Sequence, residues 1–437
     1  MSSAVRNLLA SWVPHQRWFL GEAFDAQPLA CLRPAPDVQV HILRDGANGP
    51  IYHVPVTVRQ FPLEVEPIGT CQVRPGELRY VYDAPNDPEY HRWLLNASHE
   101  ASTPGTSTPG TPTELLVNVL SGEQSNTSVV VHTNPPLIVK VFRVLSPGPN
   151  PDVDVPARLA RAGLTCIARP VGAFDLDWGA GPAHGAVVTE YILDAVDGWQ
   201  WLLTEFSNPD KPAGLDKLAD RRADVQMKLV ELGRTTADLH AGLQTEYGRF
   251  PASSDQLRTE LANRQERAVG AAAKHLGSLA AALKRTLDCL ELTDLPDRQR
   301  IHGDLHLGQV LYSASRGWVV IDFEGEPLRT VAERVTPDYP ERDIASMLRS
   351  FDYAAATLVR TGCAEHLAAE NWSSQCVESY LTGYRERRTA TNMNPLHEDL
   401  TAAYLLDRAV YEVVYETQSR PDWVDIPLGA LRKQLLQ

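Results

Sequence analysis

The sequence predicts an α+β protein built from a β-rich first lobe and a mostly helical second lobe. Up to about residue 205, short apolar runs are separated by turn signals such as Asp-Gly and Pro-Gly, which are typical of strands and hairpins. From 206 onward, apolar residues recur at three- and four-residue spacing, which is typical of amphipathic helices. A chain of 437 residues is also too long for one hydrophobic core of ordinary size.

A segment rich in Ser, Thr, Pro and Gly, ASTPGTSTPGTPT at 101–113, divides the first lobe. Such a composition has little to bury and favours an exposed loop or linker. We therefore predict an N-terminal cap subdomain at 1–100, an intermediate subdomain at 114–205 and a helical C-terminal lobe at 206–437.

The elements follow from hydrophobic periodicity and turn residues. We predict strands within 41–61, 71–84, 114–133, 135–145 and 184–192, and a helix at 155–163. We predict helices in the second lobe at 223–243, 341–358 and 400–418, and a two-strand hairpin within 310–327 that turns at Ser-Arg-Gly.

The composition disfavours several classes of protein. With 43% apolar and 22% charged residues, the chain is expected to be globular, and no stretch reaches the roughly 18 apolar residues of a membrane span. The first residues do not resemble a secretion signal, and the six cysteines show no metal-like spacing. A net charge of −14 disfavours non-specific binding of nucleic acid. We therefore expect a cytoplasmic protein with reduced thiols that binds neither membrane nor nucleic acid.

The strongest functional signal is HGDLHLGQVL at 302–311, which lies just ahead of the predicted hairpin. Asp304 precedes the hairpin, Gln309 begins it and Asp322 follows its second strand, so the fold-back can bring these side chains together. Mg²⁺ prefers oxygen ligands and usually takes one or two carboxylates, a role that suits Asp322 and Gln309. Asp304 is then expected to accept or orient the proton of a hydroxyl that attacks a phosphoryl group.

Other residues around this motif have weaker assignments. A Gly-Asp turn before a strand is common without any chemistry, although the IDFE segment at this spacing argues against that interpretation. Glu324 is predicted as a further metal ligand or as a contact to the acceptor, with a plain loop carboxylate as the alternative. We also predict that His302 takes part in catalysis and that His306 contacts the substrate.

Lys140 in LIVKVF lies in the middle of an apolar strand. Burying an ammonium group is costly unless it is paired, so a carboxylate partner is expected, and Asp152 and Asp154 are the candidates. A lysine at this place suits the binding of nucleotide phosphates. The alternative is an edge strand on which the lysine points to water.

Two further segments are candidates for nucleotide binding. SGEQSNTS at 121–128 falls between two strands, and its Ser121, Gly122, Ser125 and Asn126 offer donors to phosphate oxygens. The strand that ends in Glu190-Tyr191-Ile192 leads into the segment joining the lobes, and we expect Glu190 and Ile192 to pair with an adenine edge. A plain sheet strand is the alternative for this second segment.

The helix at 341–358 carries a second, polar face formed by Arg342, Arg349 and Tyr353. These residues are predicted to line the acceptor site, with a solvated helix face as the alternative. His240 in LHAGL is interpreted as a histidine of the core or of a helix end.

The pattern at 302–324 resembles that of known kinases. Protein kinases carry H-x-D-x-x-x-x-N followed by D-F-G, and this chain has Gln in place of the Asn and Glu in place of the Gly. HGDLH with an acidic third position after the metal aspartate resembles the aminoglycoside phosphotransferase-like kinases of small molecules. Four segments are similar to maltokinases, namely HLGQVL, DFEGEP, PHQRWFLGE at 14–22 and RDIASMLRSFDYA at 342–354.

The resemblance implies a bilobal protein-kinase-like fold in which the intermediate subdomain holds the nucleotide. It implies that Asp304 is the catalytic base, that Gln309 and Asp322 bind Mg²⁺, and that Lys140 contacts the phosphates of ATP. It further implies phosphorylation of maltose at its anomeric hydroxyl, which supplies maltose 1-phosphate for α-glucan (glycogen) synthesis from trehalose, beside trehalose synthase. A phosphotransferase of the aminoglycoside or choline kinase type and a catalytically inactive scaffold remain the alternatives.

Overall fold

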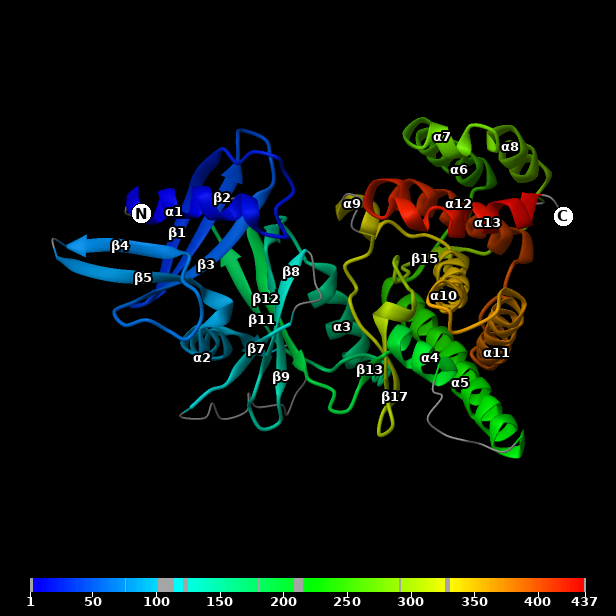
Figure 1. Cartoon of the computed structure of the whole chain (residues 1–437), viewed down its shortest axis with the longest axis horizontal. Helices are drawn as coiled ribbons and strands as arrows, with labels where there is room; N and C mark the ends of the chain where they lie inside the picture. The colour runs from blue at the N-terminus through cyan, green and yellow to red at the C-terminus, as the bar shows by residue number, and fades with distance from the viewer. Residues whose placement is uncertain are drawn as a thin grey trace. The chain divides into compact units, whose positions relative to one another are not determined.

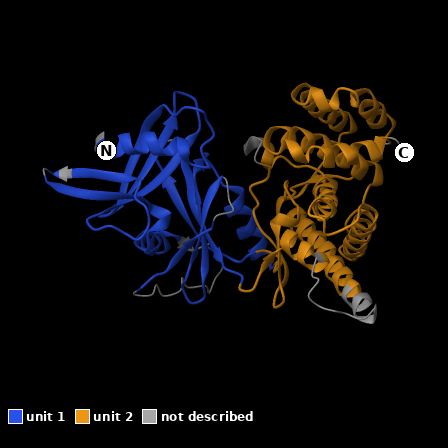
Figure 2. Ribbon diagram, viewed as in Figure 1, with its two compact units in different colours: residues 1–163, 168–192 blue, residues 164–167, 193–437 orange. Residues whose placement is uncertain are grey.

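The computed structural model describes residues 3–74, 76–100, 114–120, 125–179, 181–207, 215–290, 292–326 and 331–435. The predicted linker at 101–113 lies outside these residues. The chain divides into two compact units (Figure 2). The first unit comprises 1–163 and 168–192, and the second comprises 164–167 and 193–437. The predicted cap and intermediate segments thus share one compact unit as far as Ile192.

The first unit opens with a sheet that we call the cap sheet, in the order β1-β2-β3-β5-β4 (Figure 1). Its strands are β1 (Ala26–Ala35), β2 (Val38–Asp45), β3 (Ile51–Arg59), β4 (Gly69–Arg74) and β5 (Glu77–Asp83), and β10 (Val144–Leu145) also pairs with β3. Helix α1 (Ser3–Trp12) supplies Val5 and Leu9 to the buried cluster that contains Tyr52 and Val54 of β3. The strands predicted within 41–61 and 71–84 are therefore confirmed.

A second antiparallel sheet of the first unit has the order β6-β11-β12-β9-β8-β7. Its strands are β6 (His99–Glu100), β7 (Val117–Val119), β8 (Asn126–Val131), β9 (Leu137–Phe142), β11 (Pro170–Asp177) and β12 (Pro182–Glu190), and the helices of this unit also include α2 (Pro88–Ala97) and α3 (Pro151–Arg161). Val40 of the cap sheet shares a buried cluster with Val129 and Val139 of this sheet, so the two sheets are packed on one core.

Arg143 connects the two sheets, because it lies between β9 and β10 and is completely buried. Its guanidinium group donates to both carboxylate oxygens of Asp83 at 2.9 and 2.6 Å and to Thr127 Oγ1 at 2.8 Å. The same group lies 5.1 Å from the ring centroid of Trp18. A buried charge needs such complete pairing, so this cluster fixes the strand of Lys140 against the cap sheet.

The second unit is mainly helical. Its helices are α4 (Gly198–Ser207), α5 (Leu215–Tyr247), α6 (Ser254–Ala271), α7 (Ala273–Leu276), α8 (Ala280–Cys289), α9 (Val331–Val335), α10 (Pro340–Arg360), α11 (His366–Ala390), α12 (Glu398–Ser419) and α13 (Asp425–Leu435). Its short strands are β13 (Val196–Asp197), β14 (Arg249–Phe250), β15 (Arg298–Gln299), β16 (Val310–Ser313) and β17 (Gly317–Val320). The predicted hairpin is formed by β16 and β17, and the three predicted helices correspond to α5, α10 and α12.

Helices α5 and α11 pack closely because glycines lie at their crossing. A Cβ atom at Gly233 would lie 2.0 Å from the carbonyl oxygen of Tyr380, and one at Gly383 would lie 1.9 Å from that of Val230. Any side chain at either position would therefore force the helices apart.

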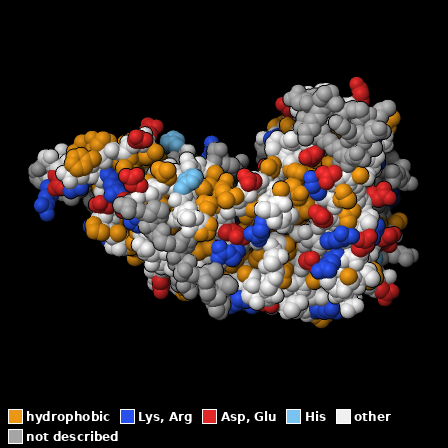
Figure 3. All heavy atoms as spheres, turned by 90° about the horizontal axis from the view of Figure 1, so that it is seen from below, with side chains coloured by type: hydrophobic (Ala, Val, Ile, Leu, Met, Phe, Trp, Pro, Cys, Tyr) orange, Lys and Arg blue, Asp and Glu red, His pale blue; other side chains and the backbone are white. Residues whose placement is uncertain are grey.

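The described surface is mixed in charge. On the face shown in Figure 3, acidic and basic side chains are interspersed over the helical unit rather than separated into large patches.

Among the described helices, none is long and apolar enough to span a bilayer.

Candidate active site

The loop of HGDLH is fixed by a buried carboxylate at the start of α10. Asp343 accepts hydrogen bonds from the backbone N–H groups of His302 at 2.8 Å and Gly303 at 2.9 Å, and from His240 Nε2 at 3.1 Å. Burial opposes the charge of Asp343, but the hydrogen bonds and the neighbouring His240 outweigh it and lower the pKa of this carboxyl group. Gly303 has φ of +89°, a conformation that glycine adopts without strain. His240 is buried, as predicted.

Asp304 lies next in this loop with its carboxylate largely shielded from water. Burial raises the pKa of Asp304 to about 6, and the guanidinium group of Arg408 opposes this rise. Arg408 Nη2 lies 3.5 Å from Asp304 Oδ1, and His306 Nε2 lies 3.9 Å from Oδ2. A carboxylate with a pKa just below neutrality is well suited to accept a proton from a hydroxyl group at physiological pH.

The two histidines of the motif are both held by local contacts. His302 is buried, its Nε2 lies 3.0 Å from the carbonyl oxygen of Ile321, and its Nδ1 lies 3.3 Å from the backbone nitrogen of Asp304. His302 therefore connects the loop before the hairpin to the residue after it. His306 Nδ1 accepts from the N–H of Gly308 at 3.0 Å, and burial lowers the pKa of His306 to about 3. The roles predicted for them in catalysis and substrate contact stay predictions.

The hairpin brings Gln309 and Asp322 together, as the sequence predicts. Gln309 Nε2 donates to Asp322 Oδ2 at 3.0 Å, and the N–H of Ile321 donates to the carbonyl oxygen of Gln309 at 3.0 Å. Carboxylate oxygens of Asp322 and Glu324 lie within 4.8 Å of each other. Two carboxylates and an amide oxygen form a donor set that suits Mg²⁺.

Asp322 has a strained backbone. Its φ is +62°, a left-handed conformation that costs energy for a residue with a side chain. Such strain persists only where the surrounding structure enforces it, and here the Gln309 hydrogen bond and the hairpin do so. The strained conformation is consistent with a functional role for the Asp322 carboxylate.

Lys140 lies in the first unit, on β9. This strand lies between β12 and β8, so the alternative of a lysine on an edge strand is wrong. Lys140 is only 8% exposed, and its Nζ donates to Asp152 Oδ2 at 2.8 Å. Of the two expected partners, Asp152 thus forms the ion pair, whereas Asp154 pairs with Arg158 one helical turn further on, at 3.0 Å.

Helix α3 begins earlier than the sequence predicts, which explains why Asp152 belongs to it. Asn150 caps the helix by accepting a hydrogen bond from the N–H of Asp152 at 2.8 Å, and Pro151 occupies the first turn. Asparagine followed by proline is a favourable helix start, and this pair at 150–151 is the local signal for the earlier beginning of α3.

The other residues predicted to bind nucleotide are in the first unit. Glu190 Oε1 accepts from the N–H of Arg169 at 2.8 Å, and Ile192 is buried. Asn126 begins β8 and donates to Ser125 Oγ at 3.2 Å. Ser121 and Gly122 lie outside the described residues. A role in nucleotide binding stays a prediction for all of these residues.

The polar face of α10 is buried, so the alternative of a solvated helix face is wrong. Arg342 forms ion pairs with Glu326 at 2.6 Å and Asp338 at 3.0 Å. Arg349 Nη2 binds Glu412 Oε2 of α12 at 2.8 Å. In the same way, Tyr353 donates to Glu416 at 3.1 Å. The contacts of Arg349 and Tyr353 hold α12 against α10. The predicted acceptor role of the three residues stays a prediction.

Sequence reasoning missed Asp343, Glu326 and Arg408. Asp343 could have been found, because it is the second residue of the 342–354 segment that resembles the kinases. Arg408 carries no local signal, since its position beside Asp304 depends on how α12 packs across the unit.

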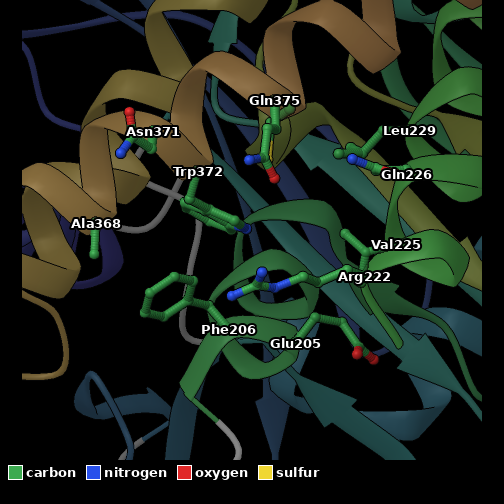
Figure 4. A pocket seen from close by; sticks show the side chains of 11 residues that line it. Glu205, Phe206, Arg222, Val225, Gln226, Leu229, Ala368, Asn371, Trp372 and Gln375 are labelled. Carbon is green, nitrogen blue, oxygen red and sulfur yellow. The ribbon is translucent and has the colours of Figure 1, made fainter. Parts of the chain in front are cut away.

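A separate cavity of about 480 Å³ lies among α4, α5 and α11 (Figure 4). Phe206 of α4 and Trp372 of α11 are among its lining residues, with ring centroids 4.8 Å apart. Its lining includes none of the predicted catalytic, metal or nucleotide-binding residues. This cavity therefore belongs to another part of the helical unit.

Two family models match parts of this chain. Residues 117–388 match the model of the phosphotransferase enzyme family, and residues 12–87 match that of the maltokinase N-terminal cap domain. The chain therefore belongs to the phosphotransferase enzyme family. The resemblance to maltokinases and to aminoglycoside phosphotransferase-like kinases is thereby confirmed.

Two proteins with similar sequences are glucosamine kinases. A glucosamine kinase of Streptacidiphilus jiangxiensis is 30% identical over 286 residues, which cover 62% of this chain and 62% of that protein. A glucosamine kinase of Mycolicibacterium smegmatis is 26% identical over 322 residues, which cover 71% of this chain and 77% of that protein.

Solved structures confirm the fold. A glucosamine kinase in complex with glucosamine, ADP and inorganic phosphate matches with a TM-score of 0.68 and 21% identity, and a second crystal form of glucosamine kinase matches with 0.72 and 22%. Both alignments cover 99% of this chain and 99% of the other. The bilobal kinase-like α+β fold that the sequence predicts is confirmed.

Proposed function

We propose that this chain transfers the terminal phosphoryl group of ATP to a hydroxyl group of a sugar, with Asp304 as the base. The observation that carries the proposal is the position of the Asp304 carboxylate, beside Arg408 and just ahead of the hairpin that joins Gln309 to Asp322. It lies in a loop immobilised by Asp343, and burial raises its pKa to about 6. A base of this strength accepts the proton of an attacking hydroxyl most effectively near neutral pH.

The remaining side chains have separable roles in the proposed reaction. Lys140, held by Asp152, binds phosphate oxygens of ATP, while Gln309, Asp322 and Glu324 hold Mg²⁺. The bound ion would neutralise charge on the phosphate groups. His302 Nε2 contacts the carbonyl oxygen of Ile321, the residue before Asp322. This contact connects the loop before the hairpin to the residues that follow it.

We propose that two further groups of residues in the first unit contact the nucleotide, one within 121–128 and one at the end of β12. Ser121, Gly122, Ser125 and Asn126 supply donors to the phosphates, and Glu190 and Ile192 contact the adenine edge. Asp154 holds the start of α3 through Arg158, next to the partner of Lys140. On the acceptor side, His306, Arg342, Arg349 and Tyr353 shape the place where the sugar binds.

Glucosamine is the first acceptor that we propose. Two relatives at 30% and 26% identity are glucosamine kinases. Because the first match spans only 62% of that relative, the acceptor has to be measured on this chain itself.

Maltose is the second candidate acceptor. It is supported by the maltokinase cap domain model at residues 12–87 and by the motif segments shared with maltokinases. In that case the product is maltose 1-phosphate, which feeds α-glucan (glycogen) synthesis from trehalose, beside trehalose synthase in the cytoplasm.

The test is an ADP-release assay with Mg²⁺ and ATP across a panel of sugars. The panel contains glucosamine, glucose, N-acetylglucosamine, maltose and trehalose, with an aminoglycoside and choline as non-sugar acceptors. Sugar-dependent ADP release that disappears in Asp304→Asn supports the proposal, and the phosphorylated position is read from the product by ³¹P NMR. Release only with the aminoglycoside or choline contradicts it, as does tight binding of ATP without turnover on any acceptor.

A further inference from the structure

Arg408 of α12 lies among three carboxylates of the helical unit. Its guanidinium group is 2.7 Å from Glu326, 3.5 Å from Asp304 and 3.6 Å from Glu412. Its side chain is 16% exposed, so water screens these interactions only weakly. Arg408 thus contacts directly the carboxylate that is proposed to accept the proton.

The charges around Asp304 make this contact important. Glu326 and Asp322 both disfavour a negative charge on Asp304, and so does burial. His306 is close, but its pKa is lowered to about 3, so it is neutral near pH 7. His302 favours the charge less strongly than Arg408 does. Among the described residues, Arg408 therefore makes the largest favourable contribution to a charged Asp304.

Arg408 is itself held rigidly. Glu326, which binds Arg408 Nη1, also binds Arg342 at 2.6 Å. Glu412, on the other side, also binds Arg349 at 2.8 Å. The ring of Tyr411 lies 5.0 Å from the guanidinium carbon of Arg408. These contacts restrict Arg408 to the position beside Asp304 before any substrate binds.

We propose that Arg408 is a positioning residue for the phosphoryl transfer, which keeps the Asp304 carboxylate charged and oriented toward the acceptor hydroxyl. This inference rests on the proposed function for the meaning of Asp304, but it assigns a role to a residue outside the recognised motif. It also gives the buried arginines of α10 a role, because Arg342 and Arg349 act on the site through the carboxylates that hold Arg408.

The physical consequence is a shift in the titration of Asp304. Without the guanidinium group, burial and the two neighbouring carboxylates are opposed only by the weaker effect of His302, and the pKa of Asp304 rises further above its ordinary value. The carboxyl group then carries its proton at neutral pH and cannot accept another. On the acidic side of the pH profile, each unit by which the pKa of Asp304 rises lowers the fraction of charged Asp304 roughly tenfold.

The primary test compares Arg408→Met with Arg408→Lys and with the control Arg385→Gln. Arg385 lies on α11 and pairs with the exposed Glu398 of α12 at 4.0 Å, so the control removes a surface guanidinium group that also faces α12. In Arg408→Met, we expect the acidic limb of the kcat profile to move to higher pH and kcat at neutral pH to fall about tenfold or more, with partial recovery at alkaline pH and little change in KM for ATP. Arg408→Lys should restore part of the loss, and added guanidinium ion should partly rescue Arg408→Met.

Two outcomes would overturn the role of Arg408. One is an Arg408→Met profile that falls equally at every pH, because that is the result of a purely structural defect. The other is a profile that matches the wild type and Arg385→Gln.

A second measurement needs no acceptor and so separates this inference from the proposed function. The Asp304 carboxyl carbon is followed by ¹³C NMR in protein labelled at aspartate, and Asp304→Asn identifies its signal. A midpoint that rises in Arg408→Met supports the inference even if no sugar proves to be a substrate. An unchanged midpoint rejects it even if the sugar kinase activity is confirmed.

Discussion

The carboxylate of Asp343 lies 2.9 Å from the backbone nitrogen of Gly303, although the two residues are 40 positions apart in the chain. Through this bond and the one to His302, the first turn of α10 holds the loop that carries Asp304. Buried hydrogen bonds to a charged acceptor are strong, so the loop is held in place before substrate arrives.

Replacement of Asp343 by Asn should reduce catalysis with little effect on overall folding. The amide keeps the shape but loses the charge and one of the acceptor oxygens, so Gly303 and Asp304 lose their fixed position. We expect kcat to fall by about 10²-fold, as misplacement of a reacting group by roughly 1 Å does. Turnover is measured beside Asp238→Asn, which removes a surface carboxylate paired with Arg387 in the same unit. Equal activity of the two variants would show that the Asp343 contact is dispensable.

Replacement of Asp304 by Asn should reduce turnover by orders of magnitude while ATP still binds. The change removes the proton acceptor and keeps the volume, so we expect kcat to fall by about 10²- to 10⁴-fold. In the wild type, kcat should decrease as pH falls through about 6, because protonation of Asp304 removes the base. Turnover is compared with nucleotide affinity from calorimetry, and a variant that keeps substantial turnover would exclude Asp304 as the base.

The proximity of Gln309 and Asp322 could be predicted from the sequence because their geometry is local. A hairpin with a short turn forces Gln309 and Asp322 together whatever the rest of the chain does, and the structure places them 3.0 Å apart. The burial of Lys140 followed from its apolar neighbours on β9. These parts of the site depend on chain segments of a few residues.

The support of the site could not be predicted in the same way. The polar stripe of Arg342, Arg349 and Tyr353 has the same helical spacing as a solvated face, and only the packing of α12 shows that it is buried. Arg408 is separated from Asp304 by 104 positions in the chain. Such contacts depend on how several helices pack together, which periodicity along one helix does not determine.

Replacement of Asp322 by Ala should remove the binding of divalent metal, because it takes away the carboxylate that Gln309 orients. We expect the affinity for Mg²⁺ with ATP to fall by about 10- to 100-fold and turnover to be lost at ordinary Mg²⁺ concentrations. Glu324→Gln tests whether the neighbouring carboxylate is a metal ligand. If Glu324 is a ligand, this change also lowers the affinity for Mg²⁺, and if it is a plain loop carboxylate, the affinity stays unchanged. Binding is measured by isothermal titration with Mg²⁺ and ATP, and unaltered affinity in Asp322→Ala would argue against the metal site.

Replacement of Asp83 by Ala should destabilise the first unit strongly. The change leaves the guanidinium group of Arg143, which is fully buried, without its bidentate partner. Breaking a buried pair in this way typically costs about 3–5 kcal/mol in free energy of unfolding. The control Asp37→Ala removes a half-exposed partner of Arg59 and should cost less than about 1 kcal/mol. Denaturant unfolding of the two variants measures both values, and a similar effect in both would mean that the Arg143 cluster contributes little.

The first unit should lose stability in mild acid because it buries three neutral histidines. Burial lowers the pKa of His41 and His91 to about 4 and that of His53 to about 3. Since their folded pKa values lie below the ordinary value of 6.5, the unfolded chain binds more protons once the pH falls below 6.5. Their stabilising effect is therefore complete above pH 6.5 and is lost as the pH falls toward the folded values, at roughly 1.4 kcal/mol per pH unit for each histidine.

His41 provides the sharpest test of this acid sensitivity, because neither ring nitrogen has a hydrogen-bond partner among the described residues. His41→Leu should keep the fold at neutral pH and reduce the acid dependence of the unfolding free energy by about one proton. The matched control is His366→Gln, whose side chain is 76% exposed in the helical unit. Denaturant unfolding is measured at a series of pH values below 6.5 for both variants and the wild type. A slope in His41→Leu that equals that of the wild type would show that His41 is already protonated or solvated in the folded protein.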